Sequence, residues 1–248
     1  MQGDGADIVE HFTARAGRYD RSSRWCTDAA LLDHIFEAAQ VDGRSAVLDL
    51  ACGTGLVSRR FHGQVGHLTG LDLTPAMAAQ ARPHLDAFVL GDAAELPFGD
   101  RHFDAVVCRQ GLQFMDLDRV LPELRRVLRP GGRLVTADLH AYGPDDRDEY
   151  FEVLRLRNPA RRNFFVAGDM AARLAAAGFD PVTAEPFISE EDVGAWADNG
   201  AIADARQQAI RDVYEQGSAP FLALHAAQVG PDRILDRMRF EITAGVCP

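Results

Sequence analysis

The stretch Val47 to Gly55, V-L-D-L-A-C-G-T-G, decides the fold of this chain. Apolar residues lead into Asp49, a turn containing Gly53 and Gly55 follows, and residues 56–61 continue with apolar side chains at helical spacing. The pattern predicts a strand, a tight turn and a helix. Glycine allows positive φ and lets a ligand approach the backbone, while the free N–H groups at the start of the helix face that ligand.

The spacing of the two glycines narrows the choice of ligand. A dinucleotide-binding loop would carry a third glycine where Ser58 stands, and a P-loop would carry a lysine, which the sequence lacks altogether. What remains is D-x-x-x-G-x-G, followed by Asp72 at the end of the next apolar run. This arrangement resembles the class I S-adenosylmethionine-dependent methyltransferases, and within them the methyltransferase type 11 or ubiquinone-biosynthesis-like group of small-molecule enzymes.

The resemblance implies how the first two strand ends bind S-adenosylmethionine. The loop that holds the methionine part of the cofactor contains Asp49, Ala51, Gly53 and Gly55. Asp72 would hold the two ribose hydroxyls, because a carboxylate offers two acceptor oxygens and an amide only one. The alternative role for Asp72 is the N-cap of the following helix, and one side chain can serve in both ways.

The next positions implied by the resemblance surround the adenine. Leu73 and Met77, which follow the second strand, would lie near the adenine face. In G-D-A-A-E-L-P-F, after the third strand, Asp92 would accept a hydrogen bond from the exocyclic amine, and the N–H of Ala93 would bond a ring nitrogen. Because Asp92 comes one strand after Asp72, both acids are expected at the same edge of the sheet.

The fourth strand ends in R-Q-G-L-Q-F-M, where the resembled family lines the gap between cofactor and substrate. A backbone carbonyl at Arg109 or Gln110 would take the methionine amine. Many relatives have a histidine or an acid where Gln113 stands, so no general base is carried over to this position. Near the N-terminus, H-F-T-A-R-A-G-R-Y-D is similar to a segment that folds over the cofactor. Tyr19 is therefore either a lid residue or an aromatic anchor for a mobile segment.

The rest of the chain predicts an α/β fold: a Rossmann-like, doubly wound sheet of seven strands, mostly parallel, with an antiparallel last strand and a helical cap. Apolar runs between turn signals predict the strands, and amphipathic segments predict the helices. The expected strands after the first are 65–72, 87–90, 103–108, 133–139, 181–187 and 237–246. The expected helices are one that starts at Thr27-Asp28 and stops at Gly43, and the segments 118–128, 145–157 and 167–177.

A length of 248 residues suits one domain with an added cap. We expect residues 1–45 to form an N-terminal helical lid and residues 46–142 to form the core that binds S-adenosylmethionine. Residues 143–248 would complete the sheet, with residues 189–229 as a helical cap over the substrate and the final strand at 237–246.

Composition limits the partners and the compartment. A net charge of -11 disfavours nucleic acid and anionic membrane surfaces, so we expect a small-molecule acceptor. The four cysteines form no C-x-x-C pair and have no histidine at zinc spacing, which favours a reducing cytosol and no metal. The polar N-terminus lacks the features of a signal peptide, and no apolar run is long enough to span a bilayer. These observations predict a cytoplasmic monomer or homodimer.

The sequence motifs say less about the catalytic and acceptor-binding residues than about the cofactor-binding residues. Methyl transfer from a sulfonium is an in-line displacement that needs alignment and a dry site. An ionisable nucleophile also needs a base, and His140 at the ligand edge of the fifth strand is the candidate; the alternative is a partly exposed histidine that leaves a strand. Arg109 could hold an acceptor carboxylate or phenolate through paired hydrogen bonds, or pair with an acid of the cap. The other expected acceptor contacts are Gln113, Tyr142 and Trp196.

The expected activity is O-, N- or C-methylation of a small molecule, with S-adenosylhomocysteine as the second product. Two alternatives stay open. The first is an enzyme of the same fold that uses the cofactor in decarboxylation, hydroxylation or cyclisation. The second is a catalytically silent partner subunit that binds the cofactor. Nothing in the sequence identifies the acceptor.

Overall fold

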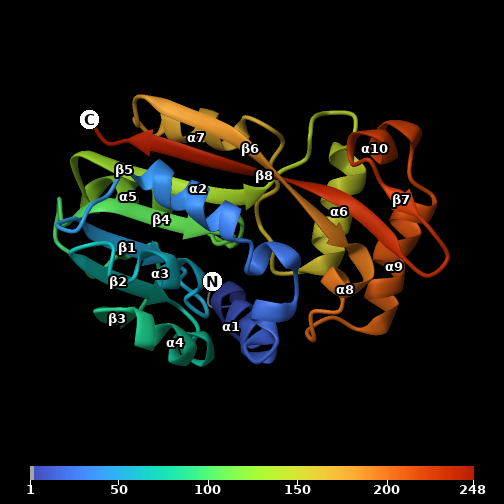
Figure 1. Cartoon of the computed structure of the whole chain (residues 1–248), viewed down its shortest axis with the longest axis horizontal. Helices are drawn as coiled ribbons and strands as arrows, with labels where there is room; N and C mark the ends of the chain where they lie inside the picture. Colours follow the sequence, from blue (N-terminus) through green and yellow to red (C-terminus); the bar gives the residue numbers. More distant parts are fainter. Residues whose placement is uncertain (1–2) are drawn as a thin grey trace.

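The computed structural model describes residues 3–248, and a single twisted sheet forms its centre (Figure 1). The spatial order of the strands is β3-β2-β1-β4-β5-β8-β6, and the two-residue strand β7 pairs with β8. The bounds are β1 Ala46–Leu50, β2 His67–Asp72, β3 Ala87–Leu90, β4 Phe103–Arg109, β5 Leu128–Leu139, β6 Val182–Asp192, β7 Gln228–Val229 and β8 Ile234–Val246.

Strands β1 to β5 are parallel, and β8 is antiparallel to both of its long neighbours, β5 and β6. This confirms the doubly wound, mostly parallel sheet with an antiparallel last strand; β7 is the one addition to the seven expected strands. The chain order reverses between β1 and β4, which are adjacent although β2 and β3 lie between them in sequence. Ligands of open α/β sheets bind outside the strand ends at such a reversal.

Helices cover both faces of the sheet, and each face has its own apolar core. One core joins α2 and α3 to the helices of the C-terminal part, and the other contains α5 and α7. The bounds are α1 Gly3–Arg15, α2 Ala29–Ala39, α3 Leu56–Phe61, α4 Pro75–Ala81, α5 Leu117–Val127, α6 Arg147–Arg157, α7 Asp169–Ala176, α8 Val193–Ala197, α9 Asp204–Glu215 and α10 Ala219–Leu224. Among the described residues, no helix has the length and apolar character needed to cross a membrane.

Local signals placed most of these elements within a few residues. Asp28 caps α2 as expected, since its carboxylate accepts hydrogen bonds from two N–H groups of the first turn. The helix ends earlier than Gly43, however, because Gln40 adopts the left-handed conformation with φ 49° and terminates it. Residues 11–20, the segment interpreted from the sequence as mobile, contain the end of α1 and the start of the 3-10 turn Tyr19–Arg21; a second 3-10 turn, Arg24–Cys26, follows.

The alternation predicted for the last strand holds only in its first half. Met238 is buried and Arg237 is exposed, as a half-covered strand requires. Glu241 was expected to face away from the core but is only 2% exposed. Its carboxylate accepts from the N–H of Gly168 at 3.1 and 3.0 Å and from Arg239 at 3.0 Å. Helix α7 covers this face, so both sides of the strand are buried there.

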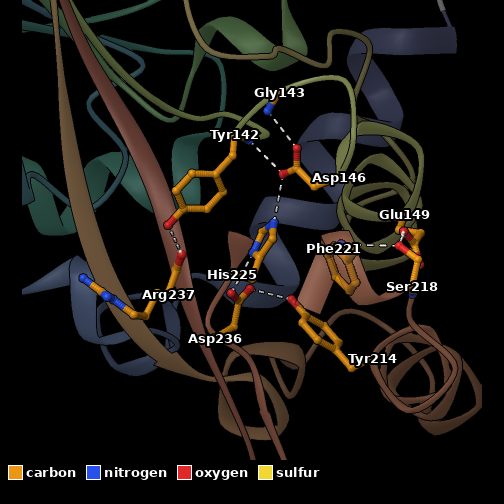
Figure 2. Close-up of polar contacts among 10 residues, drawn as sticks. All are labelled: Tyr142, Gly143, Asp146, Glu149, Tyr214, Ser218, Phe221, His225, Asp236 and Arg237. Atoms are coloured by element: carbon orange, nitrogen blue, oxygen red, sulfur yellow. Dashed lines mark hydrogen bonds and ion pairs between the residues drawn. The ribbon is translucent and has the colours of Figure 1, made fainter. Parts of the chain in front are cut away.

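The helices α6, α8, α9 and α10 gather around the ends of β6 and β8 that extend beyond the sheet (Figure 1). A buried polar network with His225 at its centre connects α6, α9 and α10 to β8 (Figure 2). The Nδ1 atom of His225 lies 2.7 Å from the carboxylate of Asp236, and Nε2 lies 3.0 Å from that of Asp146. The hydroxyl of Tyr214 donates to Asp236 at 2.6 Å. One imidazole therefore links α10, β8 and the turn before α6.

Candidate functional site

A cavity of about 330 Å³ lies outside the carboxyl ends of β1, β2, β3 and β4. This volume falls in the range of small-molecule and cofactor sites. Ten of the twelve residues expected to contact the cofactor line it, namely Tyr19, Ala51, Gly53, Asp72, Leu73, Met77, Asp92, Ala93, Arg109 and Gln110. Helix α1 adds Ile8 and Phe12 to the wall, and the segment after β4 adds Phe114 and Met115. The last three belong to segments that the sequence placed at the cofactor, although they were not singled out as contacts.

The glycine turn after β1 takes a conformation that most residues avoid. Gly53 has φ 55° and Gly55 has φ 81°, and Ala51 also has a positive φ of 54°. A Cβ on Gly55 would come within 2.8 Å of the backbone of Ala81, so this glycine is needed for the packing of α3 against α4. Gly55 does not line the cavity; it is the residue before the first turn of α3. Positive φ at a non-glycine residue costs free energy and is concentrated at ligand sites.

The carboxylate of Asp72 connects two segments of the cavity wall through hydrogen bonds. One oxygen accepts from the N–H of Gly53 at 2.8 Å, and the other accepts from the N–H of Thr74 at 2.7 Å. Thr74 is the N-cap of α4, so the alternative in which Asp72 itself is the N-cap is wrong. Asp72 is 8% exposed, and burial raises its pKa despite these hydrogen bonds. Each oxygen retains a second lone pair for a ligand.

Asp49 lies behind the glycine turn and not in the large cavity. It is 1% exposed and accepts a hydrogen bond from the hydroxyl of Ser58 in α3. Burial raises the pKa of Asp49 to about 7, although Ser58 and the charge of Arg109 oppose the shift. Asp49 borders a small pocket of about 20 Å³ beneath the turn, which Tyr19 and Arg109 also line.

The turn after β4 approaches the glycine turn closely. Gln110 has φ 55°, and a Cβ on Gly111 would come within 2.9 Å of the Cβ of Ala51. The absence of a side chain at Gly111 therefore lets the two turns close one end of the cavity together. Gln113, a few residues later, is 2% exposed, and its amide nitrogen lies 2.9 Å from both the backbone oxygen and the side-chain oxygen of Gln110.

The N-terminal segment closes over these turns. Asp20 accepts a hydrogen bond from the hydroxyl of Thr54 in the glycine turn and forms an ion pair with Arg59 at 3.1 Å. Tyr19, the residue before it, borders both the large cavity and the small pocket beneath the turn. Arg109 donates to the backbone oxygen of Cys26 at 3.1 Å, and its guanidinium lies 5.3 Å from the ring centre of Trp25. The guanidinium is therefore already engaged with the N-terminal segment.

A second, smaller cavity of about 40 Å³ adjoins the first. Two of the expected acceptor contacts, Gln113 and Trp196, lie in its wall. Four residues border both cavities, namely Phe12, Tyr19, Gln110 and Phe114. The rest of its wall comes from Arg15, Trp25, Leu139, Leu154, Arg157, Asn158 and Arg161. The sequence did not indicate these arginines as site residues, because Arg15 lies in a helix far from the other two along the chain and no local motif surrounds Arg157 and Arg161.

His140 and Tyr142 are not brought to either cavity. His140 is completely buried, with Nδ1 3.0 Å from the backbone oxygen of Val166 and 3.5 Å from the carboxylate of Glu241. Burial lowers the pKa of His140 to about 4. The placement contradicts both expectations for His140, since it is neither at the acceptor nor partly exposed. Tyr142 donates its hydroxyl to the backbone oxygen of Arg237 at 2.6 Å, near the His225 network (Figure 2).

Comparison with known proteins relates this chain to methyltransferases. A family model described as a methyltransferase domain matches residues 48–136. The demethylmenaquinone methyltransferase of Thermus thermophilus is 33% identical over 194 residues, which cover 73% of this chain and 86% of that protein. The enzyme of that name from Thermotoga maritima is 48% identical over 98 residues, or 38% of this chain and 43% of that protein.

The match to several of the curated relatives is partial, and it spans about half of their length. Among solved structures, a putative methyltransferase from Bacillus halodurans superposes with a TM-score of 0.81 at 24% identity, covering 89% of this chain and 100% of that one. At this level of identity the likeness shows the fold alone.

Proposed function

This chain belongs to the class I S-adenosylmethionine-dependent methyltransferases, the family that includes demethylmenaquinone methyltransferase, and from this premise we propose that it methylates a small-molecule acceptor. The carboxylate of Asp72 is the observation that carries the proposal. It lies in the wall of a cofactor-sized cavity, bonded to the glycine turn on one side and to the start of α4 on the other. This pair of oxygens suits two vicinal hydroxyls of a ribose.

The residues present fit S-adenosylmethionine along the whole cavity. At one end, Asp92 accepts from the N–H of Ala94 at 2.9 Å through one oxygen, which leaves the other for an adenine amine. At the opposite end, the small pocket beneath the glycine turn suits only the carboxylate of the methionine part, and Arg109 there supplies positive charge for it. Residues 3–45, of which Ile8, Phe12 and Tyr19 line the cavity, would act as the lid.

When bound, the cofactor supplies an electrophilic methyl group on a sulfonium centre. The four residues shared by the two cavities mark where acceptor and cofactor meet, and three of them are aromatic rings that exclude water. None of the four takes up a proton near neutral pH, since burial raises the pKa of Tyr19 and its hydroxyl stays protonated. We therefore assign catalysis to alignment in a dry site and not to a general base at His140.

The proposed activity is tested by titration and by turnover. We expect isothermal titration with S-adenosylmethionine to show saturable binding, and incubation with a panel of small acceptors to release S-adenosylhomocysteine together with a methylated product. Demethylmenaquinone, the acceptor after which the similar enzymes of Thermus thermophilus and Thermotoga maritima are named, belongs in that panel. Release of a modified acceptor without S-adenosylhomocysteine would support the non-methylating alternative, and binding without any turnover would support a silent subunit.

The contact between Asp20 and Thr54 gives a prediction about the lid. We expect Asp20→Ala to raise the dissociation rate of S-adenosylhomocysteine about 3- to 10-fold, because it removes a hydrogen bond and an ion pair that hold the lid on the glycine turn. Stopped-flow displacement measures this rate. Asp33→Ala is the matched control, since Asp33 forms an exposed ion pair with Arg60 outside the cavities. Equal rates in wild type and Asp20→Ala would show that the contact does not retain the cofactor.

A further inference from the structure

The second cavity has an unusual wall, because three arginines line a space of about 40 Å³. Arg15 is 4% exposed, Arg157 is 5% exposed and Arg161 is 9% exposed. Arg15 comes from α1, Arg157 ends α6, and Arg161 lies in the loop that follows. Burying a cation is costly unless an anion compensates it. Either other groups of the protein must compensate these charges, or the charges must serve to bind an anionic ligand.

No carboxylate lies in direct contact with these arginines in the described part of the chain, although the charges of buried Asp138 and Glu191 act on Arg161 and Arg157 from a greater distance. Among the described residues, none of the three forms an ion pair. Arg15 contacts His11 at 3.5 Å and lies over the rings of Phe12 and Tyr19, at 5.4 and 5.0 Å from their centres. Arg157 lies 4.8 Å from the ring centre of Trp196. Aromatic faces stabilise a cation by only about 0.5–2 kcal/mol, so positive charge remains in excess.

Arg161 differs from the other two arginines. Its guanidinium donates to the backbone oxygen of Asn163 at 2.9 Å and to that of Leu139 at 3.2 Å. These bonds make it a fixed part of the wall, whereas Arg15 and Arg157 each keep a buried Nε without a hydrogen-bond partner.

Unpaired hydrogen-bond donors gather in the same wall. Twelve buried side-chain atoms among the described residues lack a partner, and six belong to this cavity: Arg15 Nε, Trp25 Nε1, Gln110 Nε2, Gln113 Oε1, Arg157 Nε and Asn158 Nδ2. Five of the six are donors, and the only acceptor is the amide oxygen of Gln113. Buried donors are rarely left unpaired in folded proteins. A wall of donors with excess positive charge is complementary to an anionic acceptor of hydrogen bonds.

The position and size of the cavity indicate which part of a ligand enters it. It adjoins the cofactor cavity through Phe12, Tyr19, Gln110 and Phe114. A volume of about 40 Å³ holds roughly three water-sized positions, which is enough for a carboxylate but not for a whole acceptor. The body of the acceptor must then extend toward the aromatic residues at the junction.

We propose that the methyl acceptor is an organic acid whose carboxylate is bound by Arg15 and Arg157, with a flat apolar body against the aromatic side chains at the junction of the two cavities. This inference rests on the proposed function, because it assigns the acceptor of the same site. The planar guanidinium forks match the two oxygens of a carboxylate, and each charge-assisted hydrogen bond is stronger than a neutral one. A neutral quinol body alone would leave both cations uncompensated.

The matched ligands benzoate and benzamide test the charge requirement. Both tryptophans of the chain, Trp25 and Trp196, line the second cavity, so their fluorescence reports directly on occupancy. We expect benzoate to change the emission in a saturable manner, with and without S-adenosylhomocysteine, and benzamide to bind at least about tenfold more weakly. Equal affinity for the two ligands, or binding of 1,4-naphthohydroquinone in preference to benzoate, would overturn the proposal.

Substitutions of the arginines test which of these residues bind the carboxylate. We expect Arg157→Met and Arg15→Met each to weaken benzoate binding about 10- to 100-fold, while Arg147→Met, an exposed position at the start of α6, binds as wild type does. Arg157→Met should unfold at the same or a higher temperature than wild type, because it removes an uncompensated buried cation. Unchanged benzoate affinity in both cavity variants would refute the assignment.

Calorimetry with S-adenosylhomocysteine separates the two proposals. If the cofactor binds normally and benzoate is not preferred over benzamide, the proposal of an organic-acid acceptor is wrong and the proposed methyltransferase activity still stands. If benzoate binding depends on Arg157 but the cofactor does not bind, the proposed methyltransferase activity is wrong and only the acid-binding site is supported.

Discussion

Asp72→Ala will lower the affinity for S-adenosylmethionine by at least about 100-fold, because two charge-assisted hydrogen bonds to the ribose are lost and each contributes about 1.5–3 kcal/mol. The variant also leaves the N–H groups of Gly53 and Thr74 without their acceptor, so the glycine turn loses its fixed position. Isothermal titration measures the affinity, and thermal unfolding of the free protein measures how much of the loss is structural.

Two further variants define the origin of this effect. Asp72→Asn is expected to fail nearly as badly, since either orientation of the amide places its NH₂ group against one of the two N–H donors. Asp86→Ala is the matched control: Asp86 caps the N–H of Leu68 at the other end of β2 at 2.7 Å and is half exposed. An Asp72→Ala protein that binds within about threefold of wild type would contradict the cofactor site.

The sequence could predict those residues of the site whose position depends only on a local strand–turn–helix motif. A strand that ends in a glycine turn places Ala51 and Gly53 at the sheet edge whatever the remote contacts are, and the same holds for Asp72 and Asp92 after the next two strands. The parallel order of these strands then brings all four residues to one cavity. The sheet itself follows from the same apolar runs.

Residues brought together by tertiary packing could not be predicted in this way. His140 directly follows β5 at the ligand edge of the sheet, yet the segment around Val166 pairs with Ala141 and covers the imidazole. Likewise, Arg15 of α1 and Arg157 at the end of α6 line one cavity, although no spacing in the sequence indicates that they lie near each other. The alternation in β8 predicted an outward Glu241 because the pattern does not show that α7 packs on that face.

His225→Ala will cost about 3–5 kcal/mol of stability, the range observed when one partner of a buried ion pair is removed. Both ring nitrogens of His225 face carboxylates that are completely buried, those of Asp146 and Asp236 (Figure 2). Without the imidazole, two negative charges would remain in the interior with no cation. Urea unfolding measures the loss, and His67→Ala, which replaces a half-exposed histidine at the start of β2, should change stability by less than about 0.5 kcal/mol.

The pH dependence of unfolding provides an independent test of the same network. Burial alone would lower the pKa of His225, but the hydrogen bonds and charges of Asp146 and Asp236 outweigh it and raise the pKa to about 9. In the unfolded chain the pKa is near 6.5. The stabilisation from the imidazolium, about 3 kcal/mol, is therefore complete below pH 6.5 and disappears as the pH rises through 9. Wild-type stability should decline across this interval and His225→Ala should not. A wild-type profile that stays level to pH 9 would show that the folded protein does not hold this proton.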